Sequence, residues 1–170
     1  DWREPPQATA AVIKPAVCII EEQLAQNTSG GSGGGGYLQR KCNVIYGESW
    51  FVSGITGTLG VGGTNNQFDL DPGTYEVEGF SCTHKTDGGY SLMGSTDNEI
   101  QIFGVNKYNA ASSNGDGNQP FQGVFTITAK KTFKIWTYGQ TSDGTYGGGV
   151  QVNVSGRPEK YMSCKIRKLK

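Results

Sequence analysis

The sequence has no excess charge of one sign and no long apolar run. Its 170 residues carry 15 basic and 15 acidic side chains, so no net field draws the chain toward nucleic acid or an anionic membrane. The longest apolar run, Ala16 to Ile20, is far shorter than the roughly 20 residues that cross a bilayer. The opening residues also lack the apolar stretch of a secretory signal. We expect a soluble protein with neither a nucleic-acid nor a membrane partner.

Groups that commonly carry catalysis are scarce. The single histidine, His84, falls in an expected turn, and no serine or cysteine with a paired acid suggests a catalytic triad. Aspartates and glutamates occur throughout, but nothing singles out two of them as the carboxylate pair of a hydrolase. We therefore expect no enzymatic activity and no cofactor.

The four cysteines, Cys18, Cys42, Cys82 and Cys164, are spread over the whole chain. They form no CxxC pair, which argues against a zinc site. Each suits a strand as a small apolar residue, so we expect free thiols, with disulfides as the alternative.

Glycine, by contrast, is abundant. The 27 glycines cluster between short segments rich in Val, Ile, Thr, Tyr and Phe, a pattern typical of many strands joined by tight turns. No segment keeps apolar residues at the helical spacing of i, i+3, i+4 and i+7, so we expect almost no helix. The expected strands are 16–24, 37–45, 48–53, 67–70, 74–84, 89–93, 99–104, 122–128, 131–138, 149–154 and a closing segment around 162–167.

Apolar and polar residues alternate within the clearest of these segments. In 131–138, Phe133 and Ile135 face one way while Trp136 and Tyr138 face the other. Such alternation indicates antiparallel strands with one face in a core. Because Asp-Gly and Asn-Gly turns separate many short strands, the pattern predicts a sandwich or jelly roll.

The first 15 residues differ in character from the rest. They contain three prolines and no alternation, which predicts an extended arm (1–15) ahead of a single domain (16–170). The candidate anchoring residues are Trp2, Arg3, Pro5 and Pro6, because a rigid arm loses little entropy when it binds. The Gly/Ser-rich run 29–36 is interpreted as a native loop between two strands.

Several segments, taken in order, resemble a phage-encoded jelly-roll domain similar to the globular heads of the complement and tumour-necrosis-factor families. They are Val17–Gln23 before the Gly/Ser-rich loop, Leu38–Asn43 after it, Asn66–Tyr75, the pair Gly123–Ile127 and Lys131–Ile135, and the closing Cys164–Leu169. The four cysteines, the length of the glycine run and the arm depart from that family's pattern.

The resemblance implies an all-β, antiparallel jelly-roll sandwich of about ten strands, tumour-necrosis-factor-like, that assembles as a homotrimer without catalysis. It also implies a virion structural protein, a head-fibre or capsid decoration module on a bacteriophage surface. The arm would then bind a capsid or fibre-shaft protein. The alternative is a tail-fibre tip that binds a host receptor or surface carbohydrate. A secreted hydrolase or lectin-like domain unrelated to phage is the third hypothesis.

Two outward-facing aromatic residues are candidate trimer contacts. If Phe133 faces the core, Trp136 and Tyr138 face outward, and exposed aromatic patches usually mark an interface.

Two expected loops are candidate receptor surfaces. The segments 108–118 and 138–149 combine Tyr, Asn, Asp and Gly, which can stack on sugars and hydrogen-bond to hydroxyls. The candidate residues in them are Tyr108, Asn114, Asp116, Asp143 and Tyr146. Aspartates in these and other loops offer oxygens to Ca²⁺, but they lack EF-hand spacing and suit ordinary hairpin turns, so we expect no metal site.

Overall fold

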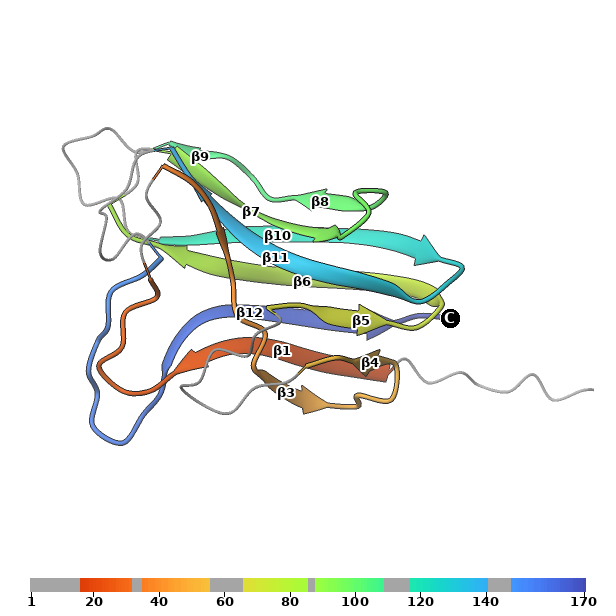
Figure 1. Cartoon of the computed structure of the whole chain (residues 1–170), viewed down its shortest axis with the longest axis horizontal. Coiled ribbons are helices and arrows are strands. Elements are labelled where there is room, and N and C mark those ends of the chain that lie inside the picture. Colours follow the sequence, from red (N-terminus) through yellow and green to blue (C-terminus); the bar gives the residue numbers. More distant parts are fainter. Residues whose placement is uncertain (1–15, 32–34, 56–65, 86–87, 109–116, 141–147) are drawn as a thin grey trace, which may run out of the picture.

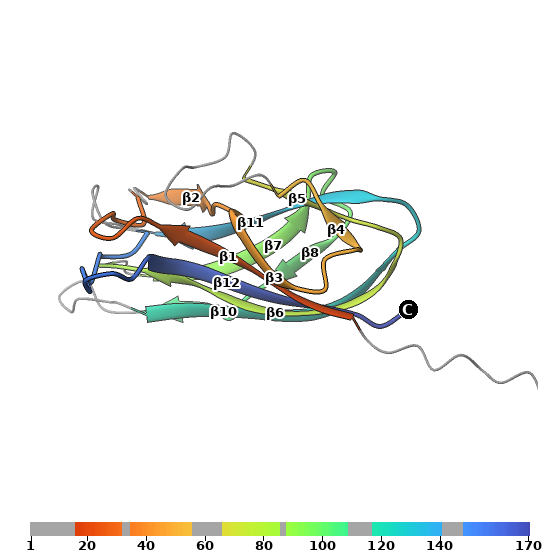
Figure 2. The ribbon, with the colours of Figure 1, turned by 90° about the horizontal axis from the view of Figure 1, so that it is seen from below.

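The chain folds as two antiparallel β-sheets that form a jelly-roll sandwich, as Figures 1 and 2 show. The computed structural model describes residues 16–31, 35–55, 66–85, 88–108, 117–140 and 148–170. These residues form twelve strands and no helix, and so contain no helix able to span a bilayer. The expected all-β jelly roll is confirmed. The segment 1–15, expected to be the arm, lies outside the described residues.

The first sheet has five strands in the order β10-β6-β12-β1-β3. Its members are β1 (Ala16–Leu24), β3 (Val44–Gly47), β6 (Gly73–Thr83), β10 (Gly117–Ile127) and β12 (Glu159–Lys168). The first and last described strands are neighbours: β1 pairs with β12 from Ala16 opposite Lys168 to Leu24 opposite Glu159. Segments far apart in the sequence therefore lie side by side.

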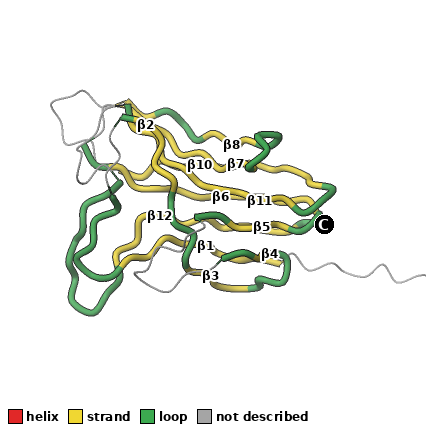
Figure 3. Tube along the Cα trace, in the orientation of Figure 1, coloured by secondary structure: helices red, strands yellow, loops and turns green. Residues whose placement is uncertain are grey.

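The second sheet has seven strands. Its path runs β4-β5-β11-β7-β8, with β2 paired to β11 and β9 paired to β7. Its members are β2 (Gly36–Gln39), β4 (Val52–Ser53), β5 (Phe68–Leu70), β7 (Gly88–Ser95), β8 (Gln101–Phe103), β9 (Lys107–Tyr108) and β11 (Lys131–Gly139). Figure 3 shows the same strands connected by loops, with no helix among the described residues.

Alternation buries one face of each sheet, as the sequence predicts. In β11, Phe133 and Ile135 are fully buried, while Trp136 and Tyr138 lie partly exposed on the outer face. In β12, Cys164 is fully buried within the apolar core. The side-chain directions expected for these strands are confirmed.

One end of the core is aromatic. Phe133 of β11 packs against Phe68 of β5 and Phe125 of β10, with ring centroids 6.0 and 5.3 Å apart. Tyr75, near the start of β6, contacts Phe125 at 5.6 Å and Phe51 at 5.9 Å. These five residues, which we call the aromatic end, join the two sheets through ring contacts alone.

The other end of the core is polar. Ser81, near the end of β6, shares hydrogen bonds with Ser91 of β7 and Thr137 of β11, and all three residues are buried. Arg40 and Glu22 form an ion pair with 2.7 Å between Nη2 and Oε2, and their side chains are 0% and 3% exposed. We call these five residues the polar end. Arg40 Nη2 also donates to the carbonyls of Gly148 and Tyr161 (3.2 and 3.4 Å), and since buried polar groups are costly without partners, these bonds offset part of that cost.

The expected strand 37–45 is split between the sheets. Its first half is β2 in the second sheet and its last residues belong to β3 in the first, so the chain crosses the sandwich at 40–43. Asn43 fixes the crossing: its side chain accepts from the amide of Gln23 (2.9 Å) and donates to the carbonyl of Gln23 (2.6 Å). The single strand expected here is therefore wrong.

Other strand boundaries also differ from expectation. The segment 149–154 is not a strand, because the amides of Val152 and Asn153 donate to the carboxylate of Glu159 (3.1 and 2.8 Å) rather than to a neighbouring strand. Of 48–53 only β4 is a strand, and β9 was not expected.

The glycine run is partly fixed to the body of the domain. The amide of Gly30 donates to the carbonyl of Gly149 (3.0 Å), and that of Gly148 donates to the carbonyl of Gly31 (2.9 Å). A Cβ at Gly30 would lie 2.2 Å from the carbonyl oxygen of Gly148, so only glycine fits there. The loop expected at 29–36 is thus held at its first residues, and 32–34 lie outside the described residues.

Candidate functional site

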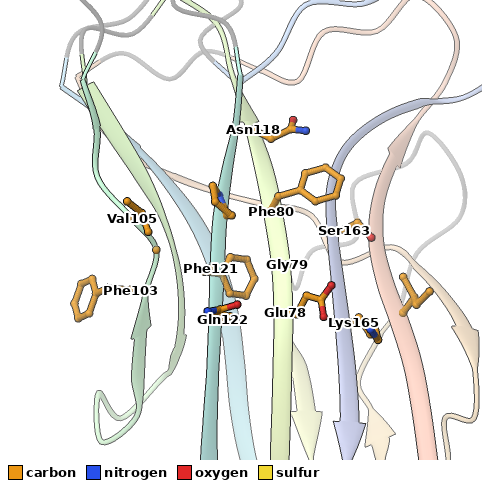
Figure 4. A pocket seen from close by; sticks show the side chains of 13 residues that line it. Glu78, Gly79, Phe80, Phe103, Val105, Asn118, Phe121, Gln122, Ser163 and Lys165 are labelled. Atoms are coloured by element: carbon orange, nitrogen blue, oxygen red, sulfur yellow. Dashed lines mark hydrogen bonds and ion pairs between the residues drawn. The ribbon is translucent and has the colours of Figure 1, made fainter.

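A groove lies on the outer face of the five-stranded sheet, where the segment that follows β8 passes beside β10. Figure 4 shows it from close by: Phe80 of β6 and Lys165 of β12 lie on one side of β10, and Phe103 and Val105 lie on the other. The groove has a volume of about 730 Å³. It joins side chains from both sheets into one concave surface.

Gly104 makes this groove possible. Its amide donates to the carbonyl of Ser91 (2.7 Å), and a Cβ on it would lie 2.2 Å from the carbonyl oxygen of Pro120 on β10. Only glycine permits so close an approach of two backbones. The contact brings the β8 edge of one sheet against the β10 edge of the other.

The groove is largely apolar, with paired charges beside its apolar residues. Val105 is 74% exposed and Phe103 is 55% exposed, which is unusual for large apolar side chains. Lys165 lies 3.2 Å from the carboxylate of Glu78 across the β12–β6 ladder. An exposed apolar patch with a polar rim is typical of a protein–protein contact.

The groove offers little for catalysis. Its one serine, Ser163, donates to the carboxylate of Glu21 (3.4 Å), and no histidine lines the groove. A serine nucleophile needs a base placed to take its proton. The described geometry therefore supports contact between proteins rather than a hydrolytic centre.

The predicted contact residues Trp136 and Tyr138 lie on the outer face of the other sheet. The Tyr138 ring packs against Tyr37 and Tyr90, with centroids 5.1 and 5.2 Å apart. The hydroxyls of Tyr37 and Tyr90 are hydrogen-bonded at 2.5 Å, and this bond, more than burial, raises the pKa of Tyr90 to about 12. The structure thus places Tyr138 in an aromatic cluster with Tyr37 and Tyr90, and Trp136 lines a hollow together with Tyr37. The role of Trp136 and Tyr138 in a trimer stays a prediction.

The cysteines are free, as expected. Burial raises the pKa of both Cys18 and Cys42 to about 12, and that of Cys164 well above its usual value. A thiol that stays protonated is a poor nucleophile and a poor metal ligand. The buried cysteines act as small apolar core residues.

Asp97, in the turn between β7 and β8, is engaged by protein groups. Its carboxylate accepts hydrogen bonds from the Lys131 ammonium, the Ser95 hydroxyl (2.5 Å) and the Glu99 amide (3.2 Å). The bond from Lys131, supported by the other two, holds the pKa of Asp97 well below its usual range. Within the described ranges, no group of three or more potential metal-ligating side chains is found.

Most of the other candidate residues lie outside the described residues. These are Trp2, Arg3, Pro5 and Pro6 of the expected arm and Asn114, Asp116, Asp143 and Tyr146 of the expected receptor loops. Tyr108 is the last residue of β9, where its backbone pairs with Gly88. The roles assigned to all of these residues stay predictions.

The sequence did not predict the groove. Its residues come from β1, β6, β8, β10, β12 and the segment after β8, so strand pairing and the approach of two sheet edges bring them together. One signal was present: Gly104 stands between two large apolar residues, Phe103 and Val105, at the end of an expected strand. A glycine in that position marks a close backbone approach.

Comparison with known proteins gives similarity at the level of structure alone. No family model and no curated protein matches the chain. The crystal structure of murine APRIL at pH 8.0 superposes with a TM-score of 0.52 and 9% identity, covering 92% of this chain and 100% of that one. APRIL at pH 5.0 gives a TM-score of 0.50, with 9% identity and the same coverage.

A structure of Eiger TNF from S. frugiperda has a TM-score of 0.41 and 14% identity, covering 92% of this chain and 94% of that one. At such identities the likeness concerns the fold. The domain is a tumour-necrosis-factor-like jelly roll.

Proposed function

We propose that this chain is a non-enzymatic, homotrimeric globular head whose subunits meet in the groove of the five-stranded sheet. The observation that carries the proposal is the exposed apolar surface around Phe80, Phe103 and Val105 on a tumour-necrosis-factor-like fold. Removing that surface from water is favourable in proportion to the apolar area buried. Trimeric assembly is also what the sequence resemblance implies.

The arrangement of the groove favours a ring of copies. The edge that carries Val105 and the sheet face that carries Lys165 line the groove from opposite sides of β10, and we propose that the edge of one subunit packs against the sheet face of the next. A contact between two different surfaces is head-to-tail, and such contacts close into rings when the rotation allows. The edge of one subunit would then lie on the sheet face of the next, around a threefold axis.

We propose further that the trimer belongs to a bacteriophage surface, as a head fibre or capsid decoration. The proposal is supported by the resemblance of the ordered segments between Val17 and Leu169 to phage-encoded jelly rolls. It is also supported by the proline-bearing segment 1–15, whose composition suits attachment to a capsid or fibre-shaft protein.

Sedimentation or light scattering of the purified full chain tests the trimer. We expect three chain masses for the parent at micromolar concentration and one for Val105→Arg, because an arginine at this edge would place an unpaired charge in the contact. Val152→Arg is the matched control, since Val152 is 75% exposed and lies outside the groove. A monomeric parent, or a trimer that survives Val105→Arg unchanged, would overturn the assignment of the groove.

Antibody labelling tests the location. Antibody raised against the purified chain should label the heads of negatively stained phage particles at regular positions. Label confined to fibre tips would replace decoration with the tail-fibre alternative. Intact particles that carry no label, although the infected cells contain the chain, would contradict a virion role.

A further inference from the structure

A second hollow lies on the outer face of the seven-stranded sheet and shares Phe103 with the groove. Its volume is about 340 Å³, near the lower end of the roughly 300–1,000 Å³ typical of small-ligand sites. The lining side chains are apolar, aromatic or amide-bearing, and none of the lining residues is charged. The residues that matter here are Trp136, Tyr37, Phe103, Asn98, Gln101 and Gly94.

The floor of the hollow is a glycine near the end of a strand. Gly94 of β7 does not have a left-handed backbone, so its conformation does not require glycine. A Cβ there would lie 3.3 Å from Cζ3 of Trp136 and 3.8 Å from Cγ of Gln101. Glycine weakens a strand, and inside one it often marks a site where another group approaches closely. The missing side chain keeps open the space between the indole and the amide.

The aromatic wall is held in place by its neighbours. Tyr37, which is 57% exposed, is fixed by the hydroxyl bond to Tyr90 and by its ring contact with Tyr138. Phe103 packs against Tyr90 with centroids 5.9 Å apart. Rings already ordered in this way lose little conformational entropy when a ligand lies on them.

The polar wall comes from the β7–β8 hairpin. Asn98 occupies a left-handed position in the turn (φ 62°), and its backbone N–H donates to the backbone carbonyl of Ser95 (3.0 Å). Its side-chain oxygen lies 3.5 Å from Nε2 of Gln101. Both side chains are exposed, so their amides keep donors and acceptors available to a ligand.

We propose that this hollow binds a neutral saccharide, with one sugar ring on Trp136 and its hydroxyls bonded by Asn98 and Gln101. A sugar presents an apolar C–H face and a rim of hydroxyls, and the hollow pairs an aromatic face with uncharged donors and acceptors. All lining residues belong to one chain, and Phe103 is shared with the groove, so a subunit packed in the groove would lie next to this wall of the hollow. Lys134 stands opposite Gly94 in the ladder but does not line the hollow.

Heteronuclear NMR titration of the full chain tests this site. The probes are maltotriose, cellotriose and the N-acetylglucosamine trimer as neutral sugars, and sialyllactose as an acidic one. At least one neutral probe should shift the Trp136 indole signal saturably, with a dissociation constant on the order of millimolar because the site is shallow and open. The Trp50 indole, 65% exposed and outside the hollow, is the internal control.

Variants separate the proposed contacts. Trp136→Ala should weaken binding by about tenfold or more, and Gln101→Ala by roughly three- to tenfold, the value of one stacking contact and one hydrogen bond. Gly94→Val should fill the floor and abolish binding, and Trp50→Leu should leave binding unchanged. Unfolding curves of each variant confirm that the domain still folds.

Three results would overturn the saccharide site. One is the absence of a saturable shift at Trp136 with every neutral probe, and another is binding of sialyllactose alone. The third is a Trp136→Ala chain that binds sugar normally but changes its mass in solution, which would make the surface a subunit contact. Because Phe103 lines both the groove and the hollow, the titration is repeated on Val105→Arg: a saturable shift at Trp136 in that chain supports the saccharide site, and its absence overturns it, whatever the mass of the parent.

Discussion

The two ends of the core solve the same packing problem by different chemistry. At the aromatic end, Phe133 and its neighbours join the sheets through non-directional ring contacts. At the polar end, Ser81 and Arg40 join the sheets through hydrogen bonds and an ion pair that require fixed partners. The aromatic end should therefore tolerate changes of shape, whereas the polar end should not tolerate the loss of one partner.

The largest effect is expected from Phe133→Ala at the aromatic end. The change leaves Phe68 and Phe125 facing an empty space and should lower the free energy of unfolding by about 4 kcal/mol. Urea unfolding followed by fluorescence measures the loss. Val124→Ala, on an exposed position of β10, should change stability by less than about 0.5 kcal/mol. Equal effects at the two positions would show that the ring cluster does not hold the sheets together.

Arg40→Met at the polar end should cost about 3 kcal/mol, because Glu22 is left buried without its partner. Burial raises the pKa of Glu22 even against the nearby positive charges, so its carboxyl can take up a proton, which limits the loss. The double change Arg40→Met with Glu22→Leu should regain most of the stability. A double variant as unstable as the sum of the single variants would mean that the ion pair itself contributes little.

Ser81→Ala should cost about 1–2 kcal/mol, because the buried hydroxyls of Ser91 and Thr137 both lose a partner. Thr126→Ala is the control, because it removes a hydrogen bond between the hydroxyls of Thr126 and Thr74 at an exposed position. Chemical denaturation at neutral pH gives both values. If the two substitutions lower the free energy of unfolding equally, the burial of the Ser81 hydrogen bonds does not increase their contribution to stability.

The smallest effect on stability is expected from a substitution of Asp97, which belongs to neither the aromatic end nor the polar end of the core. Its pKa is lowered in the folded chain, so its carboxylate contributes stability above the unfolded value of about 3.9 and loses it as the pH falls below that value. Asp97→Asn should flatten the dependence of stability on pH in this acidic range. Thr96→Ala, an exposed change in the same turn, should leave the dependence intact. Denaturant midpoints of the parent, Asp97→Asn and Thr96→Ala, measured at several acidic pH values, test this difference.

The aromatic end could be predicted from the sequence because alternation reports burial directly. Alternation in 131–138 puts Phe133 and Trp136 on opposite faces, and the structure places Phe133 inside and Trp136 outside. The polar end could not be predicted, since Arg40 and Glu22 look like surface residues until the chain crossing at 40–43 places them inside the sandwich. A charged residue in a sequence carries no sign that its partner is buried beside it.

The candidate surfaces show the same limit. Trp136 could be identified from the sequence because the outward direction of its side chain follows from the alternation within its own strand. The groove around Val105 was not found, because it arises where one sheet edge meets another, and that depends on pairings between distant segments. The face that a side chain takes within its own strand was predictable, whereas the partner that it meets from a distant segment was not.

The pairing of β1 with β12 has a consequence for how the domain is made. One edge of β1 pairs with β3 (residues 44–47), but its other edge pairs with residues 159–168 and must wait for nearly the whole domain to leave the ribosome. Until then its backbone and its apolar face lack that partner, and such exposed edges favour aggregation. Closing so long a loop also slows folding, to roughly milliseconds to seconds for domains with mostly distant contacts. The yield of folded chain should therefore depend on the rate and temperature of synthesis as well as on its final stability.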